Sequence, residues 1–351
     1  MKKALLLSIL GAFKGERTIY GALHILQGKK SAQAIQDSHF YSLLPFYNLT
    51  PQMTRIDLEK LTQELVHEQS IILDEEFAVL TDKGQEKLAE FAQNHPYMTE
   101  LNGLKYLQQT TEYWLRLTLL IQTATHLIIK QPHFVPVTSN HSVQKWVKAQ
   151  IKQNRNGLDH LVHQLYKECD AFLSTCSTSQ ATAFVLQLSS PAQIGLTIQQ
   201  IAERLQMEEL NVAVMHKATL HRLFNAFQTH TFETLAICKV NEQTFSTATA
   251  QKTAQLLKEG YTLLQVGNKR RLKQSTIEDH IVELALYDST FSIEAYVTEQ
   301  EIRAVDKVAN ECNTLKLKEL REALGEEFTY FKIRLALTRK DYLNGSTTII
   351  R

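Results

Sequence analysis

The stretch Asn268–His280, "NKRRLKQSTIEDH", is the strongest indication of the structure of the C-terminal part of this chain. Four cations lie between Lys269 and Lys273, a short polar segment follows, and the next charges are acidic. Ser275 and Glu278 have the spacing of a capping box, in which each side chain bonds the backbone of the other at a helix start. The pattern therefore predicts a basic turn followed by a helix that begins near Ser275.

The residues on both sides of this stretch extend the pattern to three helices. "TATAQKTAQLLKEG" (247–260) predicts a helix that Gly260 ends, and "TLLQVGNKRRL" (262–272) predicts a second. In the third, Ile277, Ile281 and Leu284 fall on one face at spacings of four and three, which predicts burial of that face. Together these segments predict a helix–turn–helix.

The composition of the whole chain favours a mainly α, multi-domain protein. The 351 residues exceed what one ordinary hydrophobic core needs and suggest two domains or three small ones. Only 12 Gly and 6 Pro are present, whereas strands and tight turns need these residues. The scarcity predicts few strands.

The charge balance limits the kind of nucleic-acid contact that we expect. Lys and Arg total 38 against 37 Asp and Glu, a net charge of +1. Proteins that wrap nucleic acid over a broad surface are usually more basic, so any contact should be local. The four cysteines form no C-x-x-C pair, which predicts reduced thiols and a cytoplasmic location.

The first 95 residues predict a winged-helix-like domain. Helices are expected near 3–13, 17–27, 30–44 and 54–68. In "SIILDEEFAVLTDKGQEKLAEF" (70–91), apolar runs flank the acidic turn Asp74–Glu76 and predict a short β-hairpin, after which Thr81 caps another helix. A wing of this kind either contacts DNA or only packs, and the residues leave both possibilities open.

The remainder divides into three predicted parts. Residues 99–190 form a helical middle region, and residues 191–244 form a helical segment with a possible helix–turn–helix. In that segment, "LTIQQIAERLQM" (196–207) predicts a helix capped by Thr197 that buries Ile201, Ala202 and Leu205. Residues 245–343 form the C-terminal helix–turn–helix domain.

Two long stretches resemble a known family. "TAQLLKEGYTLLQVGNKRRLKQSTIEDHIVELAL" (253–286) and "LKLKELREALGEEFTYFKIRLALT" (315–338) are similar to the helicase-associated helix–turn–helix domain found at the C-terminus of some RecQ-type helicases. That domain also occurs in a stand-alone YpbB-like family of Gram-positive bacteria, typically encoded beside a RecQ-type helicase gene. "FKGERTIYGALHILQGKKSAQAIQDSHFYSLLPFY" (13–47) resembles the start of that family. The resemblance is weaker between about 95 and 250.

This resemblance implies a role in DNA repair or recombination beside a helicase, and it supplies no catalytic residue. One position departs from the family: Gly267 stands in the second helix where Ala is common. Glycine inside a helix costs about 1 kcal/mol relative to Ala but still permits close helix approach, so the fold expectation is unchanged.

Seven residues of the basic turn and the following helix start are candidates for nucleic-acid contact: Lys269, Arg270, Arg271, Lys273, Gln274, Ser275 and Thr276. Against this, the third helix is expected to expose Asp279 and Glu283, with Glu278 at its start. These carboxylates argue against deep insertion into the major groove and favour contact with the DNA backbone. A solvated structural corner and a face that docks onto a basic protein remain alternatives.

The other motifs give only weak evidence for a phosphate-binding or metal-binding site. "LQGKKS" (26–31) lacks the first glycine of a phosphate-binding loop, although Lys29 and Lys30 with Lys14 and Arg17 make a basic corner. His160 and His163 share a helix face, but no third metal ligand follows at a fixed spacing. We therefore expect no cofactor, no metal, no enzymatic activity and no membrane segment.

The sequence leaves three functions open. The first is a non-catalytic DNA-binding accessory factor of a RecQ-type helicase. The second is a protein adaptor that binds the helicase without binding DNA. The third is a helix–turn–helix transcriptional regulator, which would read one short site as a dimer. The charge balance favours the first two.

Overall fold

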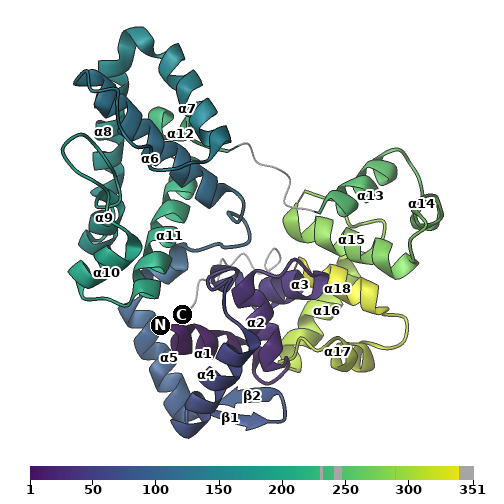
Figure 1. Ribbon diagram of the computed structural model, residues 1–351. Helices are drawn as coiled ribbons and strands as arrows, with labels where there is room; N and C mark the ends of the chain where they lie inside the picture. Colours follow the sequence, from purple (N-terminus) through teal and green to yellow (C-terminus); the bar gives the residue numbers. More distant parts are fainter. Residues whose placement is uncertain (230–231, 241–246, 289, 340–351) are drawn as a thin grey trace. The chain divides into compact units, whose positions relative to one another are not determined.

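Most of the chain is α-helical in the computed structural model, which describes residues 1–229, 232–240, 247–288 and 290–339 (Figure 1). Within these ranges the strands form one two-stranded antiparallel sheet. The prediction of a mainly α protein with one short hairpin and a C-terminal helix–turn–helix is confirmed. No helix in these ranges is both long enough and apolar enough to cross a bilayer.

The chain divides into two compact units. Of the described residues, one unit contains 3–91 together with those from 247 to 339, and the other contains those from 92 to 240 with Met1 and Lys2. The N-terminal and C-terminal predicted domains thus share a unit, as do the two predicted middle parts. Residues 241–246 and 340–343, at the edges of the last two predicted domains, lie outside the described residues.

The N-terminal segment of the first unit has the element order of a winged-helix domain with an insertion. Its elements are α1 (Lys2–Phe13), α2 (Ile19–Gln27), α3 (Ala32–Phe40), the 3-10 turn η1 (Leu44–Phe46), α4 (Arg55–His67), β1 (Ile71–Asp74), β2 (Phe77–Leu80) and α5 (Asp82–Asn94). Thr18, between α1 and α2, bridges Phe77 and adds a short third partner to the hairpin. The helix predicted over 30–44 is shorter: it ends at Phe40, and the 3-10 turn Leu44–Phe46, which contains Pro45, follows.

The hairpin and its capping threonine follow the predicted pattern. Ile72 pairs with Val79 across the strands, and Glu75 adopts a left-handed backbone conformation (φ 50°) at the tip. The Thr81 hydroxyl accepts a hydrogen bond from the Gly84 N–H at 3.1 Å, which caps α5 as predicted. The tip is acidic, and the Ile72 and Val79 side chains are 65% and 48% exposed.

The C-terminal segment completes the core of the same unit. It contains α13 (Ala248–Lys258), α14 (Leu263–Arg270), α15 (Gln274–Tyr287), α16 (Glu299–Glu311), α17 (Leu317–Leu324) and α18 (Tyr330–Leu337). Helix α15 lies at its centre and packs against α3, α13, α14 and α18. Phe40 joins the apolar cluster around α15, and the Glu16 carboxylate accepts the Leu315 N–H at 3.0 Å. The two ends of the chain therefore build one core.

The second unit is entirely helical within the described residues. Its elements are η2 (Pro96–Glu100), α6 (Gln109–Ile128), α7 (His141–Gln153), η3 (Arg155–Gly157), α8 (Leu158–Leu173), α9 (Thr178–Val185), α10 (Ile198–Leu205), α11 (Glu209–Ala226) and α12 (Glu233–Ala236). Trp114 and Trp146 pack against its core. Helix α11 buries His216 and His221, and the Trp114 ring lies 4.5 Å from the His216 ring between centroids.

Thiol reactivity should follow the burial of the four cysteines. Cys238 is fully buried, and burial raises the pKa of the Cys169 thiol to about 12, whereas Cys312 is exposed. Because the thiolate is the reactive form, we expect Cys312 to react first with a thiol reagent such as DTNB in the native protein. Rapid modification of Cys169 before unfolding would contradict this expectation.

Candidate nucleic-acid interface

The predicted helix–turn–helix corner is formed by α14, a three-residue turn and α15. Thr262 caps α14 in a reciprocal capping box with Gln265. Arg271 ends the helix in a left-handed conformation (φ 54°), and the Leu272 N–H donates to the Gly267 carbonyl at 3.0 Å. These hydrogen bonds fix the backbone conformation of the turn between the two helices.

Gly267 lies where the turn folds back against α14. A Cβ added there would approach the Leu272 carbonyl oxygen to 3.3 Å, which is tight without being a clash. A small residue is therefore required, and the departure from the family's alanine is compatible with the observed geometry. The side chains of Val266, Ile277 and Ile281 are buried and stabilise the corner from its inner side.

The predicted capping box at the start of α15 is wrong. The helix begins at Gln274, one residue earlier than predicted, and Lys273 occupies the N-cap position without a side-chain cap bond. Glu278 instead accepts a hydrogen bond from the Gln274 amide at 2.9 Å. As a result, no capping side chain bonds the first N–H groups of α15, and Gln274 and Ser275 at this end of the helix are exposed.

Lys269, Arg271 and Lys273 form the exposed cationic tip of the corner. The Lys269 ammonium lies 4.1 Å from the centre of the Tyr261 ring and donates to its hydroxyl at 2.9 Å. Gln274 and Ser275 are exposed beside this tip, and Thr276 is half-buried. The structure thus brings six of the seven candidate residues together on one edge of the three-helix segment.

Arg270 has a different environment. Its guanidinium donates to the Thr249 carbonyl oxygen at 2.7 Å and to the Thr253 hydroxyl, and it lies 3.4 Å from Nδ1 of His280. These contacts join the end of α14 to α13 and α15. Burial, together with the nearby Arg270 charge, lowers the pKa of His280, so its ring stays neutral beside the guanidinium. Arg270 therefore holds the three helices together.

Replacing Arg270 with alanine should affect stability more than DNA affinity. The change removes charged hydrogen bonds, which contribute about 1.5–3 kcal/mol each, and leaves Thr253 and His280 with fewer partners. We expect the Tm of the unit to fall by several degrees. Arg271→Ala is the matched control, because Arg271 is exposed, and its Tm should stay close to that of the parent in differential scanning calorimetry. An Arg270→Ala protein with unchanged Tm would contradict this role.

The expectation that α15 exposes Asp279 and Glu283 is wrong for Glu283, whereas the Asp279 side chain is 39% exposed. Glu283 is 7% exposed, and its carboxylate accepts hydrogen bonds from the Thr247 N–H and hydroxyl at the start of α13. Asp279 forms an ion pair with Arg334 of α18. One acid is therefore used as a helix cap and the other is paired with a cation, which leaves Glu278 at the start of α15 as the remaining electrostatic objection to phosphate binding at this corner.

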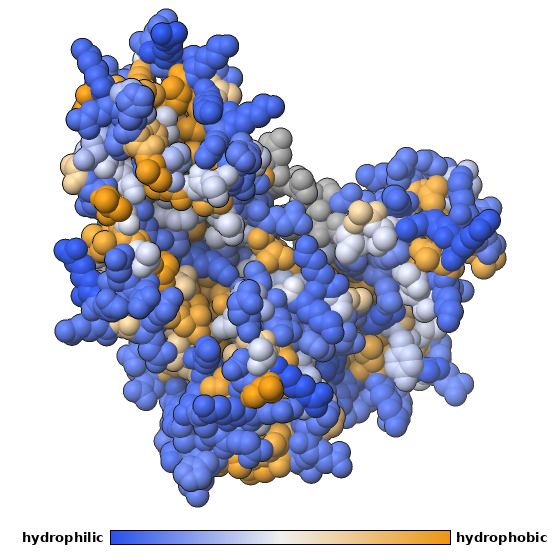
Figure 2. All heavy atoms as spheres, viewed as in Figure 1, coloured by the Kyte–Doolittle hydropathy of each residue, from blue (hydrophilic) through white to orange (hydrophobic). Residues whose placement is uncertain are grey.

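The charge around the corner is strongly positive for a nearly neutral chain. Residues 248–276 contain six cations and one carboxylate, a net charge of +5. Lys252 and Lys258 on α13 are exposed and add to the three cations of the tip. Sequence reasoning missed these two lysines, because nothing in the pattern of α13 distinguishes them from ordinary solvated side chains. In Figure 2 the lobe that holds α13 and α14 is hydrophilic over most of the visible face.

The segment 191–244 contains a second corner of the same geometry. Thr197 caps α10 in a capping box with Gln200, Gln206 ends the helix with a φ of 54°, and the Met207 N–H donates to the Ala202 carbonyl at 2.9 Å. The helix–turn–helix predicted here is thus present. Its charge is opposite: residues 183–211 contain one cation and three carboxylates, a net charge of −2.

The second corner is also covered where a reading helix would be exposed. Helix α11 packs against η2, and the Tyr97 hydroxyl donates to the Asn211 side chain. Asn211 is the counterpart of Thr276, because both lie five residues after the left-handed residue of their turn. An acidic, covered corner does not suit DNA contact.

The wing offers no better alternative. Its tip, Asp74–Glu76, is acidic, and its outward-facing side chains Ile72, Phe77 and Val79 are apolar. In the basic corner near "LQGKKS", Arg17 is paired with Asp37 at 2.9 Å and Lys14 donates to Asn313 at 2.9 Å. Lys14, Lys29 and Lys30 of that corner are exposed, whereas Arg17 is half-buried.

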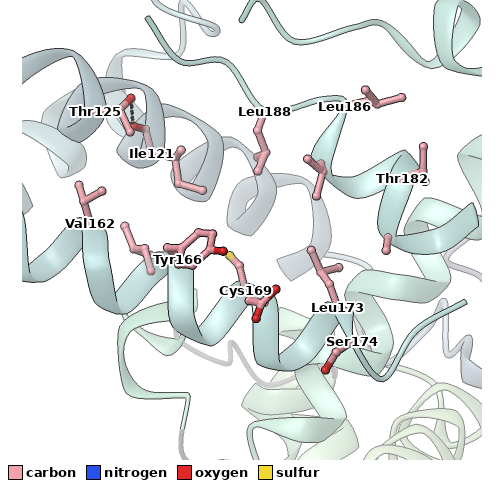
Figure 3. A pocket seen from close by; sticks show the side chains of 14 residues that line it. Ile121, Thr125, Val162, Tyr166, Cys169, Leu173, Ser174, Thr182, Leu186 and Leu188 are labelled. Carbon is pink, nitrogen blue, oxygen red and sulfur yellow. Dashed lines mark hydrogen bonds between the residues drawn. The ribbon is translucent and has the colours of Figure 1, made fainter. Parts of the chain in front are cut away.

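A cavity of about 720 Å³ lies among α6, α8, α9 and the segment that follows α9 (Figure 3). Figure 3 shows aliphatic side chains such as Val162, Leu173 and Leu188 around it, with Tyr166 and Cys169 on the α8 side. Asp170 is the only charged residue of its lining. The described residues bring no group of three or more His, Cys, Asp or Glu side chains together for a metal ion.

The fold and the exposed basic corner define a helix–turn–helix protein. A family model described as a helix-turn-helix domain matches residues 249–337, which include the whole corner. Over 340 residues the chain is 28% identical to "Protein YpbB" of Bacillus subtilis (strain 168), and the match covers 96% of each chain. The resemblance to YpbB-like proteins predicted from the sequence is thereby confirmed. No solved structure matches the chain.

Proposed function

We propose that this chain is a non-catalytic DNA-binding accessory factor that works in the cytoplasm with a RecQ-type helicase in DNA repair or recombination. The observation that carries the DNA-binding part is the exposed cationic tip Lys269, Arg271 and Lys273 on a helix–turn–helix corner, within a segment (residues 248–276) of net charge +5. Cations held at fixed spacing beside helix N–H groups suit phosphate oxygens. The helicase part rests on the family resemblance alone.

The adaptor alternative has a specific observation in its favour. The wing combines the exposed apolar side chains Ile72, Phe77 and Val79 with an acidic tip, and the second corner has a net charge of −2. Surfaces of this kind suit contact with a protein better than contact with DNA. A single molecule can use both surfaces, so the adaptor role competes with the proposal only if DNA binding is absent.

Two measurements on the full-length chain test the proposal. The first is co-purification with a RecQ-type helicase of the same organism, and the second is titration of the chain alone with duplex, forked and single-stranded DNA. The proposal expects both a stable complex and DNA binding that weakens steeply as salt rises. Helicase binding without any DNA binding would support the adaptor instead. Failure to bind either would reject both.

The transcriptional regulator remains testable in the same titration. A regulator would bind one symmetric duplex site far more tightly than unrelated duplexes, and it would do so as a dimer. Such selectivity, found together with a dimer in sedimentation, would replace the proposed function.

A further inference from the structure

The burial pattern of α15 limits how the corner can meet nucleic acid. A recognition helix lies in the major groove with its N-terminal residues against the base edges, and its outer face must stay exposed for the helix to enter the groove. In α15, exposure is confined to the first turns, because every residue from His280 to Ala285 is buried. The exposed part of α15 is therefore limited to the six residues before His280, about 9 Å of helix.

Helices of the same unit cause this burial from both sides. On one side α13 contacts α15 through the bond between the Thr253 hydroxyl and His280. On the other side α18 supplies Arg334 to Asp279, and α3 from the N-terminal segment packs along the helix with the His39 ring against Tyr287. Because α3 is part of the same core, a groove-reading face cannot open without separating the two ends of the chain.

The corner also lacks what single-stranded nucleic acid requires. Proteins that bind single strands stack the bases on exposed aromatic rings within a basic groove. In the described part of α13–α15 and the turns between them, the aromatic residues are Tyr261 and Tyr287. Lys269 covers the Tyr261 ring, and Tyr287 packs against His39. Neither ring offers a stacking platform.

From these observations we infer that the corner binds the sugar–phosphate backbone of duplex DNA end-on and without sequence discrimination. This inference rests on the proposed DNA-binding function and specifies its substrate. Lys269, Arg271 and Lys273 contact phosphates from the tip of the corner, and the N–H groups at the start of α15 receive a phosphate oxygen. Gln274 contributes no base contact, because the burial of α15 from His280 onward keeps the helix from lying in the major groove.

The test uses the full-length chain and two fluorescent duplexes of about 20 base pairs with unrelated sequences and equal base composition, together with their separated strands. Anisotropy at about 50 and 200 mM salt should give duplex affinities within about threefold of each other and single strands at least about tenfold weaker. The logarithm of duplex affinity should fall with the logarithm of salt with a slope of about −3, as expected for three phosphate contacts.

Two single variants sharpen the test. Lys273→Ala should weaken both duplexes by the same factor, roughly five- to tenfold, because a phosphate contact carries no sequence information. Gln274→Ala is the matched neighbour and should leave both affinities within about twofold. A preference above about thirtyfold for one duplex, or a ratio that changes in Gln274→Ala, would overturn the inference by showing base reading.

Other outcomes separate the inference from the function on which it depends. Single strands that bind as tightly as duplexes would overturn the duplex preference while leaving DNA binding intact. Absence of binding to every nucleic acid at low salt would reject the proposed function, and the inference would be rejected with it.

Discussion

Simultaneous replacement of Lys269, Arg271 and Lys273 with alanine is expected to lower the affinity for duplex DNA on the order of a hundredfold at about 0.1 M salt. Each phosphate contact releases condensed counterions, so three lost contacts remove most of the salt-dependent binding. The same protein should unfold within about 2 °C of the parent, because the three side chains are exposed. Anisotropy titration and scanning calorimetry on one preparation measure both quantities.

A charge-matched control distinguishes contact from net charge. Arg303, Lys307 and Lys318 belong to the same unit, and their side chains are 68%, 74% and 80% exposed. Each has a carboxylate partner four residues away on its own helix, so these positions add little local positive potential. Their triple alanine variant should lose less than about threefold in affinity. Equal losses in the two triple variants would mean that the corner has no special role.

The second large effect concerns acid stability of the unit formed by residues 92–242. Burial lowers the pKa of His216 to about 4, and burial together with nearby Lys217 lowers that of His221 to about 3, both below the usual value of 6.5. The unfolded chain therefore binds more protons than the folded chain between about pH 6.5 and pH 3–4. Stability is fully present above pH 6.5 and is lost as the pH falls through this window.

The expected size of this loss is a large part of the total stability. At pH 4.5 each histidine would contribute a loss on the order of 2–3 kcal/mol relative to pH 7.5, so the pair would cost about 5 kcal/mol. A domain of this size is stable by about 5–15 kcal/mol. Protonation of His221 would also break its acceptor contact with the Asn102 N–H, which measures 3.0 Å.

The tryptophans make this effect measurable in the intact chain. The chain has two Trp residues, Trp114 and Trp146, and both pack in the core of this unit. Urea unfolding followed by Trp fluorescence between pH 7.5 and 4.5 should show a midpoint that moves to lower urea as pH falls. A His221→Gln variant should show a shallower pH dependence by about one proton, whatever its absolute stability. An unchanged slope would remove His221 from the explanation.

Much of the fold follows from local sequence patterns. Thr197 and Thr81 cap the helices that they were predicted to cap, and the hairpin register follows from apolar runs on both sides of an acidic turn. Gly and Pro scarcity correctly predicted a helical chain. The pairing of the N-terminal segment with the C-terminal one had no local signal, since the contacts of α3 with α15 join residues far apart in sequence.

The sequence predicted where the candidate site lies, but it did not predict the exposure and the partners of several of its side chains. Exposure of Lys269, Arg271 and Lys273 follows from the amphipathic pattern of α14 and the turn. The inward position of Arg270 does not, because it depends on acceptors from α13. The burial of Glu283 and the ion pair of the partly exposed Asp279 were missed for the same reason: their partners, Thr247 and Arg334, come from other elements. Tertiary partners of charged side chains cannot be read from one helix.

The assembly of one core from both ends of the chain has a consequence for biosynthesis. During translation, residues 3–91 leave the ribosome long before α13–α18 exist, whereas residues 92–242 are contiguous and can fold first. The apolar face of α3 stays exposed until α15 has been synthesised. During this interval the nascent chain can aggregate or bind chaperones. A truncated transcript would yield a protein in which residues 92–242 can fold but residues 3–91 lack their partner helices. An excised C-terminal fragment would expose an apolar surface that is buried in the native molecule.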